Sequence, residues 1–331
     1  AARAGIGHVV VPMEQVREAR LVEGITVHGV GTVRELAAVL RGEQVPERLP
    51  DVVPIGTARR EPDLADVAGQ DEARWAVEIA AAGAHHLSLS GPPGVGKTLL
   101  AERLPGILPD LSSGEALEVA AIRSLSGLYV DGVLPRRPPY SAPHHSASVA
   151  ALVGGGSSIA RPGAISLAHR GVLFLDEVPE FSPTVLEALR IPLEKGYVEL
   201  ARSRAATRYP ARFQLVVAAN PCPCGYHGLA GRTCTCPPNA VRRYRDRLSG
   251  PILDRIDMQQ TLRPMNQSYL RKAMRRASEP SAAVAARVAE ARARQLHRLA
   301  GLGYLTNAEV PGRCCATSCR ARRGSTSSTR P

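Results

Sequence analysis

The chain has 331 residues, with 42 Lys and Arg against 30 Asp and Glu, and a formal net charge of +12. This length supports two or three domains with a substantial core. No apolar run is long enough to span a membrane and no secretory signal is present, so we expect a cytoplasmic protein. The charge is uneven, because residues 1–200 carry 18 basic and 24 acidic side chains, whereas residues 201–331 carry 24 and 6. The basic part predicts a polyanionic partner, although a solvated basic face has the same composition.

The first 45 residues predict a small α+β segment in which each of two strands is followed by a helix. The expected strands and helices, in chain order, are residues 6–11, 13–21, 25–28 and 32–40. Thr32 and Glu35 stand at the spacing of a capping box before the second helix. Residues 46–62 are rich in Pro and charge and predict a linker. The segment has the character of a partial domain, so we expect the chain to begin inside a larger protein.

Residues 91–98, Gly-Pro-Pro-Gly-Val-Gly-Lys-Thr, have the spacing of a phosphate-binding loop. Three glycines let backbone N–H groups face an anion, while Lys97 can reach the β- and γ-phosphates and Thr98 can bind Mg²⁺. A strand predicted before the loop and a helix predicted after it direct the helix N-terminus at the phosphates. The alternative is a glycine-rich turn with a chance lysine. The predicted ATP-binding residues are Gly91, Pro92, Pro93, Gly94, Val95, Gly96, Lys97 and Thr98.

Two further predicted strands end in polar residues. Residues 171–175 form an apolar run typical of a strand buried on both faces, and Asp176 and Glu177 follow it. Because ligands gather at the carboxyl ends of parallel strands, Asp176 is predicted to hold Mg²⁺, mostly through water, and Glu177 to polarise the attacking water. The strand at residues 213–220 ends in Asn220, which can orient that water or touch the γ-phosphate. The alternatives are a helix N-cap pair for the carboxylates and a turn residue for the amide.

Four cysteines form two C-x-C pairs directly after the third predicted strand. Thiolates at the spacing of Cys222, Cys224, Cys234 and Cys236 can close a tetrahedral zinc site, with His227 as a substitute ligand. Disulfides are not expected in the cytosol, so the alternative is free thiols. We therefore expect a small zinc-binding insertion near the nucleotide site.

The C-terminal part predicts helices and then a change of character. Residues 263–312 are expected to form part of a helical lid, with an amphipathic helix at residues 281–299. Residues 313–331 are rich in Arg, Ser and Thr without apolar periodicity, so we expect disorder. We interpret this change as a truncated or frame-shifted C-terminus, a hypothesis that resequencing the coding region decides.

Several longer motifs lie between residues 60 and 312. They are Pro143-His-His-Ser-Ala-Ser148, Ala151-Leu-Val-Gly-Gly-Gly156, Arg161-Pro-Gly163, Gly171-Val-Leu-Phe-Leu-Asp-Glu177, Asn220-Pro-Cys-Pro-Cys-Gly225 and Arg247-Leu-Ser-Gly-Pro-Ile-Leu-Asp-Arg-Ile-Asp257. With these motifs the chain resembles the ComM/YifB branch of the magnesium-chelatase-like AAA+ ATPases. The resemblance implies an α/β fold, a P-loop AAA+ three-layer sandwich with a parallel sheet at residues 63–262, followed by a truncated helical lid.

The resemblance also implies that residues 1–45 are part of a Lon-protease-like N-terminal domain. Proteolysis of the Lon type needs a Ser nucleophile and a Lys base. Residues 1–50 contain neither Ser nor Lys, so this segment cannot hold the dyad.

The family further implies a hexameric ring that encircles DNA, with a link to branch migration during natural transformation. Arg255 is similar to the arginine that completes a neighbouring subunit's site in such rings, although an ion pair with Asp254 or Asp257 is the simpler reading. Two pore-facing hairpins are implied, around residues 153–162 and 195–211, with an exposed basic hairpin as the alternative. Their candidate DNA-phosphate contacts are Arg161, Arg202, Arg204 and Arg208.

The leading functional hypothesis is ATP-driven DNA translocation or branch-migration helicase activity. The first alternative is a chelatase-type ATPase that remodels a protein partner, and DNA stimulation of the ATPase distinguishes the two. The second alternative is an inactive nucleotide-binding fragment, for which failure to form a ring with ATP is the sign. The predicted catalytic residues are Lys97, Asp176, Glu177, Asn220 and Arg255.

Overall fold

The structure is a computed structural model that describes most of the chain in two compact units. One unit comprises residues 1–61 and 110–136, and the other comprises residues 62–109 and 137–331. Almost all of the predicted linker and the whole predicted disordered segment lie outside the described residues. Within the described ranges, no helix has the length and apolar character needed to cross a membrane. The described residues are 1–43, 61–128, 133–156, 160–201, 206–229, 231–247, 250–275 and 278–311.

The first unit contains a parallel pair of strands with short helices. The strands are β1 (His8–Pro12) and β2 (Thr26–Val30). At the start of α2, Thr32 Oγ1 accepts the Glu35 N–H and the Glu35 carboxylate accepts the Thr32 N–H, which confirms the predicted capping box. The helices of this unit are η1 (Ala2–Ala4), η2 (Met13–Gln15), α1 (Val16–Ala19), α2 (Val33–Leu40) and α5 (Ser113–Leu125).

The second unit is built on a five-stranded sheet in which every neighbouring pair is parallel. Its order is β11-β3-β10-β7-β4, so β10 lies between β3 and β7, and Val216 stands opposite both Leu87 and Phe174. β3, β7 and β10 confirm the three strands predicted from the sequence. The strands are β3 (Leu87–Ser90), β4 (Tyr140–Ser141), β7 (Val172–Leu175), β10 (Gln214–Ala219) and β11 (Met258–Thr261).

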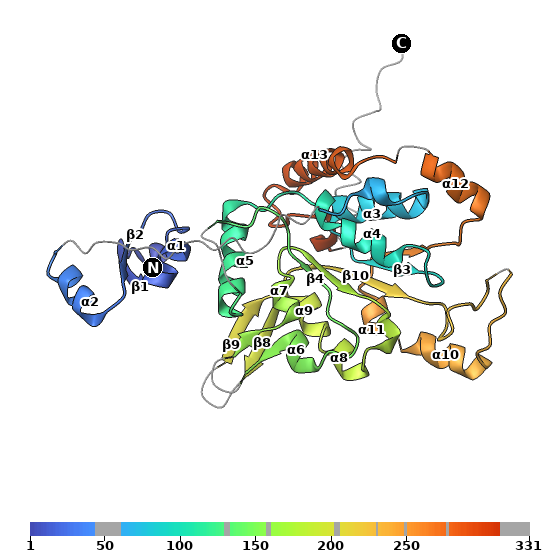
Figure 1. Ribbon diagram of the computed structural model, residues 1–331, viewed down its shortest axis with the longest axis horizontal. Helices are drawn as coiled ribbons and strands as arrows, with labels where there is room; N and C mark the ends of the chain where they lie inside the picture. The colour runs from blue at the N-terminus through green and yellow to red at the C-terminus, as the bar shows by residue number, and fades with distance from the viewer. Residues whose placement is uncertain are drawn as a thin grey trace, which may run out of the picture. The chain divides into compact units, whose positions relative to one another are not determined.

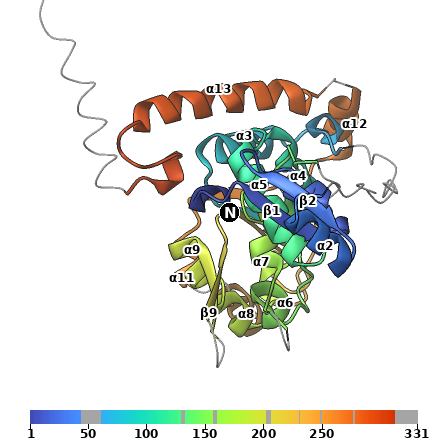
Figure 2. The same ribbon diagram turned by 90° about the vertical axis from the view of Figure 1, so that its left-hand side faces the viewer.

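Helices cover both faces of this sheet. Alternate residues of the central strands enter two hydrophobic clusters, Phe174 and Val216 on one face and Leu173 and Leu215 on the other. The first face is covered by α3 (Asp71–Gly83), α4 (Lys97–Arg103) and α13 (Ser281–Leu299) (Figures 1 and 2). The opposite face is covered by α6 (Val149–Val153), α7 (Ala164–Leu167), α8 (Pro183–Glu187) and α9 (Arg190–Lys195). The predicted three-layer α/β sandwich with a parallel sheet is confirmed.

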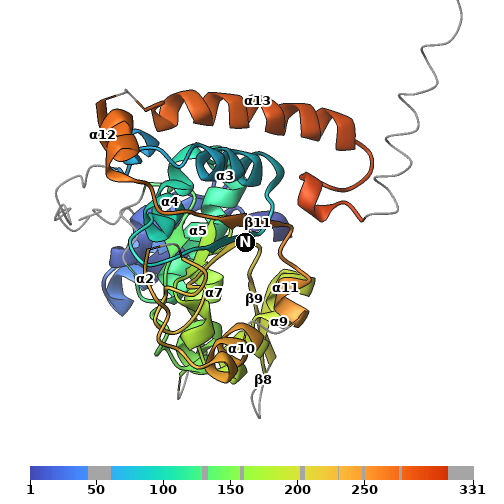
Figure 3. The same ribbon diagram turned by 90° about the vertical axis from the view of Figure 1, so that its right-hand side faces the viewer.

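The helix α13, with 19 residues, lies among the helices that cover the first face of the sheet. α13 begins and ends where the sequence predicts an amphipathic helix, and it runs along α3 (Figure 3). Val284 and Val288 enter the cluster on the first face. The other helices are η3 (Leu64–Asp66), η4 (Pro105–Ile107), η5 (Val178–Glu180), α10 (Pro238–Asp246), α11 (Gly250–Leu253), α12 (Gln267–Arg275) and η6 (Asn307–Glu309).

Two antiparallel hairpins lie in contact with each other beside α6. The Tyr209 hydroxyl donates to the Ala160 carbonyl oxygen, and the Leu200 side chain lies close to Gly154. Both hairpins implied by the family resemblance are therefore present, and they are linked. Their strands are β5 (Gly154–Gly155), β6 (Arg161–Pro162), β8 (Tyr197–Ala201) and β9 (Ala206–Pro210).

Candidate active site

The glycine-rich loop joins the end of β3 to the start of α4, as its sequence predicts. Gly94 and Gly96 have φ angles of 75° and 99°, in the left-handed region that favours glycine. A Cβ at either position would meet nothing within 4 Å. The loop therefore has the backbone conformation that glycine permits, and open space lies beside it for a ligand. These features fit the phosphates of a nucleotide.

Lys97 ties this loop to the end of a neighbouring strand. Its buried Nζ donates to the carbonyl oxygens of Gly91 and Pro92 at 2.6 and 2.9 Å, and to Asn220 Oδ1 at 2.9 Å. Burial lowers the pKa of Lys97 from its ordinary value, and the neighbouring Asp176 acts in the opposite direction. Asn220 follows β10 directly. The amide predicted to lie near the phosphates is thus in contact with the loop lysine.

Thr98 and Asp176 bring two oxygen atoms together. Thr98 Oγ1 donates to Asp176 Oδ2 at 2.7 Å, and Asp176 Oδ1 accepts the Glu177 N–H at 2.9 Å. Hydroxyl and carboxylate oxygens are ligands that Mg²⁺ prefers in proteins. The residues present therefore fit a magnesium ion beside the phosphates.

Glu177 lies next to this pair, and its side chain caps no helix among the described residues. Its φ of 49° is in the left-handed region, and it precedes η5 without a side-chain capping bond. Ser182 caps α8 instead, by accepting the Val185 N–H. The Glu177 carboxylate is half-exposed, with Oε2 3.8 Å from His145 Nδ1. Sequence analysis gave His145 no individual role, and the Pro-His-His-Ser motif that contains it was the only signal.

Gln70 and Tyr244 also lie at the site, and sequence analysis missed both. Gln70 Nε2 donates to the carbonyl oxygens of Val95 and Arg263, at 3.2 and 2.9 Å, and so joins the phosphate loop to the segment after β11. Burial raises the pKa of Tyr244 to about 12, while a hydrogen bond from the Asn220 backbone acts against this rise. Neither residue is part of a recognisable motif. Each reaches the site through contacts with residues that are distant in sequence, so no local pattern marks it.

Arg255 and the phosphate loop of the same chain lie at opposite edges of the sheet. Arg255 precedes β11, which runs parallel to β3 with Met258 opposite Leu87. It is therefore at the amino edge of the sheet, whereas the phosphate loop leaves the carboxyl edge. Among the described residues its ion pair is with Glu194 of α9. The simpler reading from the sequence, a pair with Asp254 or Asp257, is wrong because the side chain points toward α9.

The candidate DNA contacts are described only in part. Arg161 is exposed in β6. Arg208 Nε donates to Glu199 Oε1 at 3.1 Å across the second hairpin, and the guanidinium lies 4.9 Å from the centre of the Tyr197 ring. The two other candidates, Arg202 and Arg204, lie outside the described residues.

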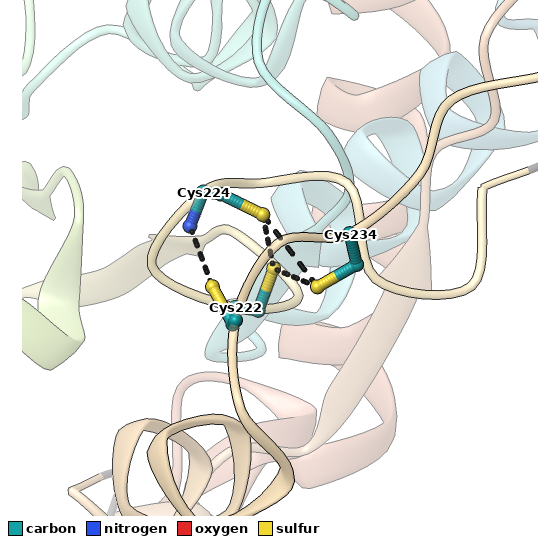
Figure 4. A group of neighbouring side chains, drawn as sticks. Cys222, Cys224 and Cys234 are labelled. Atoms are coloured by element: carbon teal, nitrogen blue, oxygen red, sulfur yellow. Dashed lines mark hydrogen bonds between the residues drawn. The ribbon is translucent and has the colours of Figure 1, made fainter.

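The four predicted cysteines converge after β10. Their sulfur atoms all lie within 4.8 Å of one another, and the cysteines are free of disulfides. Cys222 Sγ is 3.3 Å from Cys224 Sγ and 3.7 Å from Cys234 Sγ (Figure 4). Cys224 N–H donates to Cys236 Sγ at 3.4 Å. His227, the predicted substitute ligand, contributes its backbone N–H to Cys222 Sγ at 3.3 Å.

The fold and this arrangement define a class of protein. A glycine-rich loop with a lysine and a threonine, a carboxylate pair after β7 and an amide after β10 meet at one edge of a parallel sheet. Such a site belongs to the P-loop nucleoside triphosphatases. Residues 63–270 match the family model described as magnesium chelatase, subunit ChlI, and the chain belongs to this family of AAA+ proteins.

Relatives place the chain in the ComM/YifB group of that family, as predicted. An uncharacterized protein of Mycobacterium tuberculosis H37Rv is 53% identical over 316 residues, which cover 94% of this chain and 61% of the relative. The uncharacterized protein YifB of Escherichia coli K12 is 45% identical over 290 residues, covering 88% and 56%. Competence protein ComM of Haemophilus influenzae is 41% identical over 323 residues, covering 95% and 62%. The chain thus spans about three fifths of the length of these relatives.

Among solved structures, the chain is similar to the complex between subunits BchI and BchD of magnesium chelatase, which is based on a single-particle cryo-EM reconstruction. The TM-score is 0.44 and the identity 19%, over 72% of this chain and 77% of that chain.

Proposed function

We propose that this chain is an ATP-binding and ATP-hydrolysing AAA+ motor that acts on DNA. The observation that carries the ATPase part is the convergence of Lys97, Thr98, Asp176 and Asn220 at the adjoining carboxyl ends of β3, β7 and β10. Hydrolysis of a phosphoanhydride needs little beyond positioning and charge stabilisation, and these four side chains provide both.

Each of these residues has a separate part in the proposed reaction. When ATP binds, the Lys97 ammonium group exchanges its contacts with the loop carbonyl oxygens for contacts with the β- and γ-phosphates. The Asn220 amide oxygen accepts from Lys97 Nζ and holds it at the end of β10. Thr98 and Asp176 hold Mg²⁺, which when bound neutralises phosphate charge. Glu177 orients and polarises the attacking water.

Arg255 is proposed to complete the site of a neighbouring subunit in a hexameric ring. Its position at the amino edge of the sheet supports this role, because it lies at the edge opposite its own phosphate loop. A head-to-tail contact that repeats around a closed ring would place it at the next subunit's nucleotide. In that arrangement Arg255 exchanges Glu194 for the phosphates, and such an arginine contributes about 10³–10⁵ in rate.

DNA is the proposed substrate for three reasons. One relative is named a competence protein, and residues 201–331 carry 24 basic against 6 acidic side chains. The two linked hairpins also supply Arg161 and Arg208. Contacts of this kind bind phosphates without reading sequence, so binding should weaken steeply as salt rises. Further exposed basic residues lie on α10 and α12: Arg242, Arg243, Arg245, Arg271, Lys272 and Arg275.

The second candidate is a chelatase-type ATPase that remodels a protein partner. The observation that favours it is the family model itself, which is named for a magnesium chelatase subunit. Both candidates use the same ATP site, so only the partner that stimulates hydrolysis separates them.

The test is ATP turnover by the whole chain with and without single-stranded and branched DNA. We expect DNA to stimulate the wild type, and Lys97→Ala and Glu177→Gln to lower turnover by about 10²-fold or more. Glu187→Gln is the matched control, because this exposed glutamate pairs with Arg190 on the covering helices and should leave turnover unchanged.

Three results would count against the proposal. Normal turnover by Lys97→Ala overturns the ATPase assignment. If the rate of ATP turnover is the same with and without DNA, and no DNA is retained on filters at low salt, the chelatase-type motor is favoured. No turnover in the wild type and no ring on size-exclusion chromatography with ATP favours a nucleotide-binding fragment that does not cycle.

We also propose that Cys222, Cys224, Cys234 and Cys236 hold one structural Zn²⁺ in a reducing, cytoplasmic setting. The convergence of their sulfur atoms supports this assignment, because four thiolates form a closed tetrahedral zinc site. Metal analysis of the purified chain checks it.

A further inference from the structure

The cysteine loop lies directly on the phosphate loop. Gly225, one residue after Cys224, has a φ of 82°, and a Cβ at this position would lie 2.5 Å from Pro93 Cδ and 2.6 Å from Pro93 Cγ. These separations are too short for real carbon atoms, so the backbone at Gly225 must be in contact with Pro93. Pro93 is the second proline of the phosphate loop. Only glycine satisfies both the backbone conformation and this close approach.

The same short segment also carries Asn220. Pro221 alone separates Asn220, whose Oδ1 accepts from Lys97, from Cys222. Cys222 is buried, and its carbonyl oxygen accepts the Gly225 N–H at 2.9 Å, which closes a tight turn. Residues 220–225 therefore contain two cysteines, the contact with Pro93 and the amide that holds Lys97.

The sulfur positions fit a zinc ion. A tetrahedral site with Zn–S bonds of about 2.3 Å has sulfur atoms about 3.8 Å apart. The distances from Cys222 to Cys224 and Cys234 are 3.3 and 3.7 Å, and Cys224 to Cys234 is 3.6 Å (Figure 4). A disulfide needs about 2.05 Å. Backbone N–H groups of Cys224 and His227 donate to sulfur, as outer-shell groups do around bound metals.

We propose that the zinc centre is a brace for the phosphate loop. The metal fixes the turn at residues 220–225, and this turn holds Pro93 and Asn220 in the positions that ATP binding requires. Loss of the metal then lowers nucleotide affinity, although none of the cysteines touches the nucleotide. This inference rests on the proposed ATPase function and adds a metal requirement to its site.

Two glycines of the cysteine loop provide a matched test. Gly228 has a φ of 76°, close to that of Gly225, but a Cβ there would meet nothing within 4 Å. Gly225→Ala and Gly228→Ala therefore introduce similar backbone strain, and only the first presses on Pro93. We expect Gly225→Ala to keep its zinc and to bind a fluorescent ADP analogue about tenfold more weakly, whereas Gly228→Ala stays within about twofold of wild type.

Removal of the metal is the second arm. The double variant Cys234→Ser with Cys236→Ser changes only cysteines outside the 220–225 turn. We expect one zinc per wild-type chain by elemental analysis, loss of zinc in the variant and about tenfold weaker binding of the ADP analogue. If the variant unfolds by circular dichroism, chelation of the wild type followed by zinc addition takes its place and must lower and then restore affinity.

Several outcomes overturn the proposal that the zinc centre braces the phosphate loop. These are a wild type without zinc, equal nucleotide affinity in the two glycine variants, and unchanged affinity after the zinc has left. Each leaves the ATPase proposal standing if the wild type binds nucleotide. A zinc-loaded, folded wild type that binds no nucleotide instead defeats the proposed function.

Discussion

At the scale of single residues, Asp257 shows how one carboxylate joins two strands of the sheet. Its Oδ2 accepts the His86 N–H at 2.8 Å, just before β3, and lies 3.6 Å from His85 Nδ1. Burial by itself raises the pKa of Asp257, but the nearby His85 side chain and the hydrogen bond from the His86 N–H outweigh it, and the pKa falls below its ordinary 3.8. Asp257 precedes β11, so this contact ties β11 to β3.

The lowered pKa of Asp257 predicts a pH dependence of stability. A carboxylate with a lower pKa in the folded state stabilises the fold above its unfolded pKa, and this contribution is lost as pH falls toward the folded value. We expect the free energy of unfolding to drop between about pH 5 and pH 3, and to drop less in Asp257→Asn. Urea unfolding across this range measures it. Asp254→Asn, an exposed carboxylate three residues earlier, is the control, and identical pH profiles for both variants would contradict the prediction.

At the scale of elements, α13 is held to α3 by one buried amide as well as by apolar packing. Gln295 Nε2 donates to the Ala82 carbonyl oxygen at 2.6 Å, and its Oε1 accepts the Asn307 N–H at 3.0 Å. Gln295 is buried. Its neighbour Arg294 is exposed and pairs with Glu290 on the same helix. Adjacent residues of one helix therefore present a buried and a solvated polar contact.

These two contacts predict different costs of removal. Gln295→Ala leaves a partly buried carbonyl oxygen of Ala82 and a partly buried N–H of Asn307 without their partner, and we expect a loss of about 1–3 kcal/mol in the free energy of unfolding. Arg294→Ala removes only an exposed ion pair, and we expect a loss below about 1 kcal/mol. Urea denaturation of both variants compares them. Equal losses would show that the Gln295 contacts do not hold α13.

At the scale of the whole molecule, proximity in sequence decided what could be predicted. The phosphate loop and the carboxylate pair each follow a strand with a strong apolar pattern. Their residues, and their position at the carboxyl edge of the sheet, were therefore predictable. The four cysteines lie within fifteen residues, which made their convergence predictable from spacing. Glu194 is 61 residues from Arg255, and Gln70 is 193 residues from Arg263. No local pattern signals such pairs, because they exist only after the layers pack.

The proposed ring predicts that two inactive variants restore ATP turnover when they are mixed, because each site would combine residues from two subunits. Lys97→Ala removes a residue of a chain's own site, whereas Arg255→Ala removes a residue proposed to serve the next subunit. Each variant should be nearly inactive alone, but a mixture should regain measurable ATP turnover, because some contacts combine an intact Lys97 with an intact Arg255. The mixture is compared with each variant at the same total concentration. A mixture no more active than its components would contradict a role for Arg255 in trans.

The pair between Arg255 and Glu194 has a mechanical consequence for the hairpins. Glu194 stands on α9, and only Lys195 and Gly196 separate it from β8. The second hairpin is in turn fastened to the first through Tyr209 and the Ala160 carbonyl. In the proposed ring, where Arg255 would leave Glu194 for a neighbouring nucleotide, α9 would lose this ion pair just before β8. If the ring proposal holds, we therefore expect a change of partner at Arg255 to displace α9 and, with it, strands β8 and β9 together with β5 and β6.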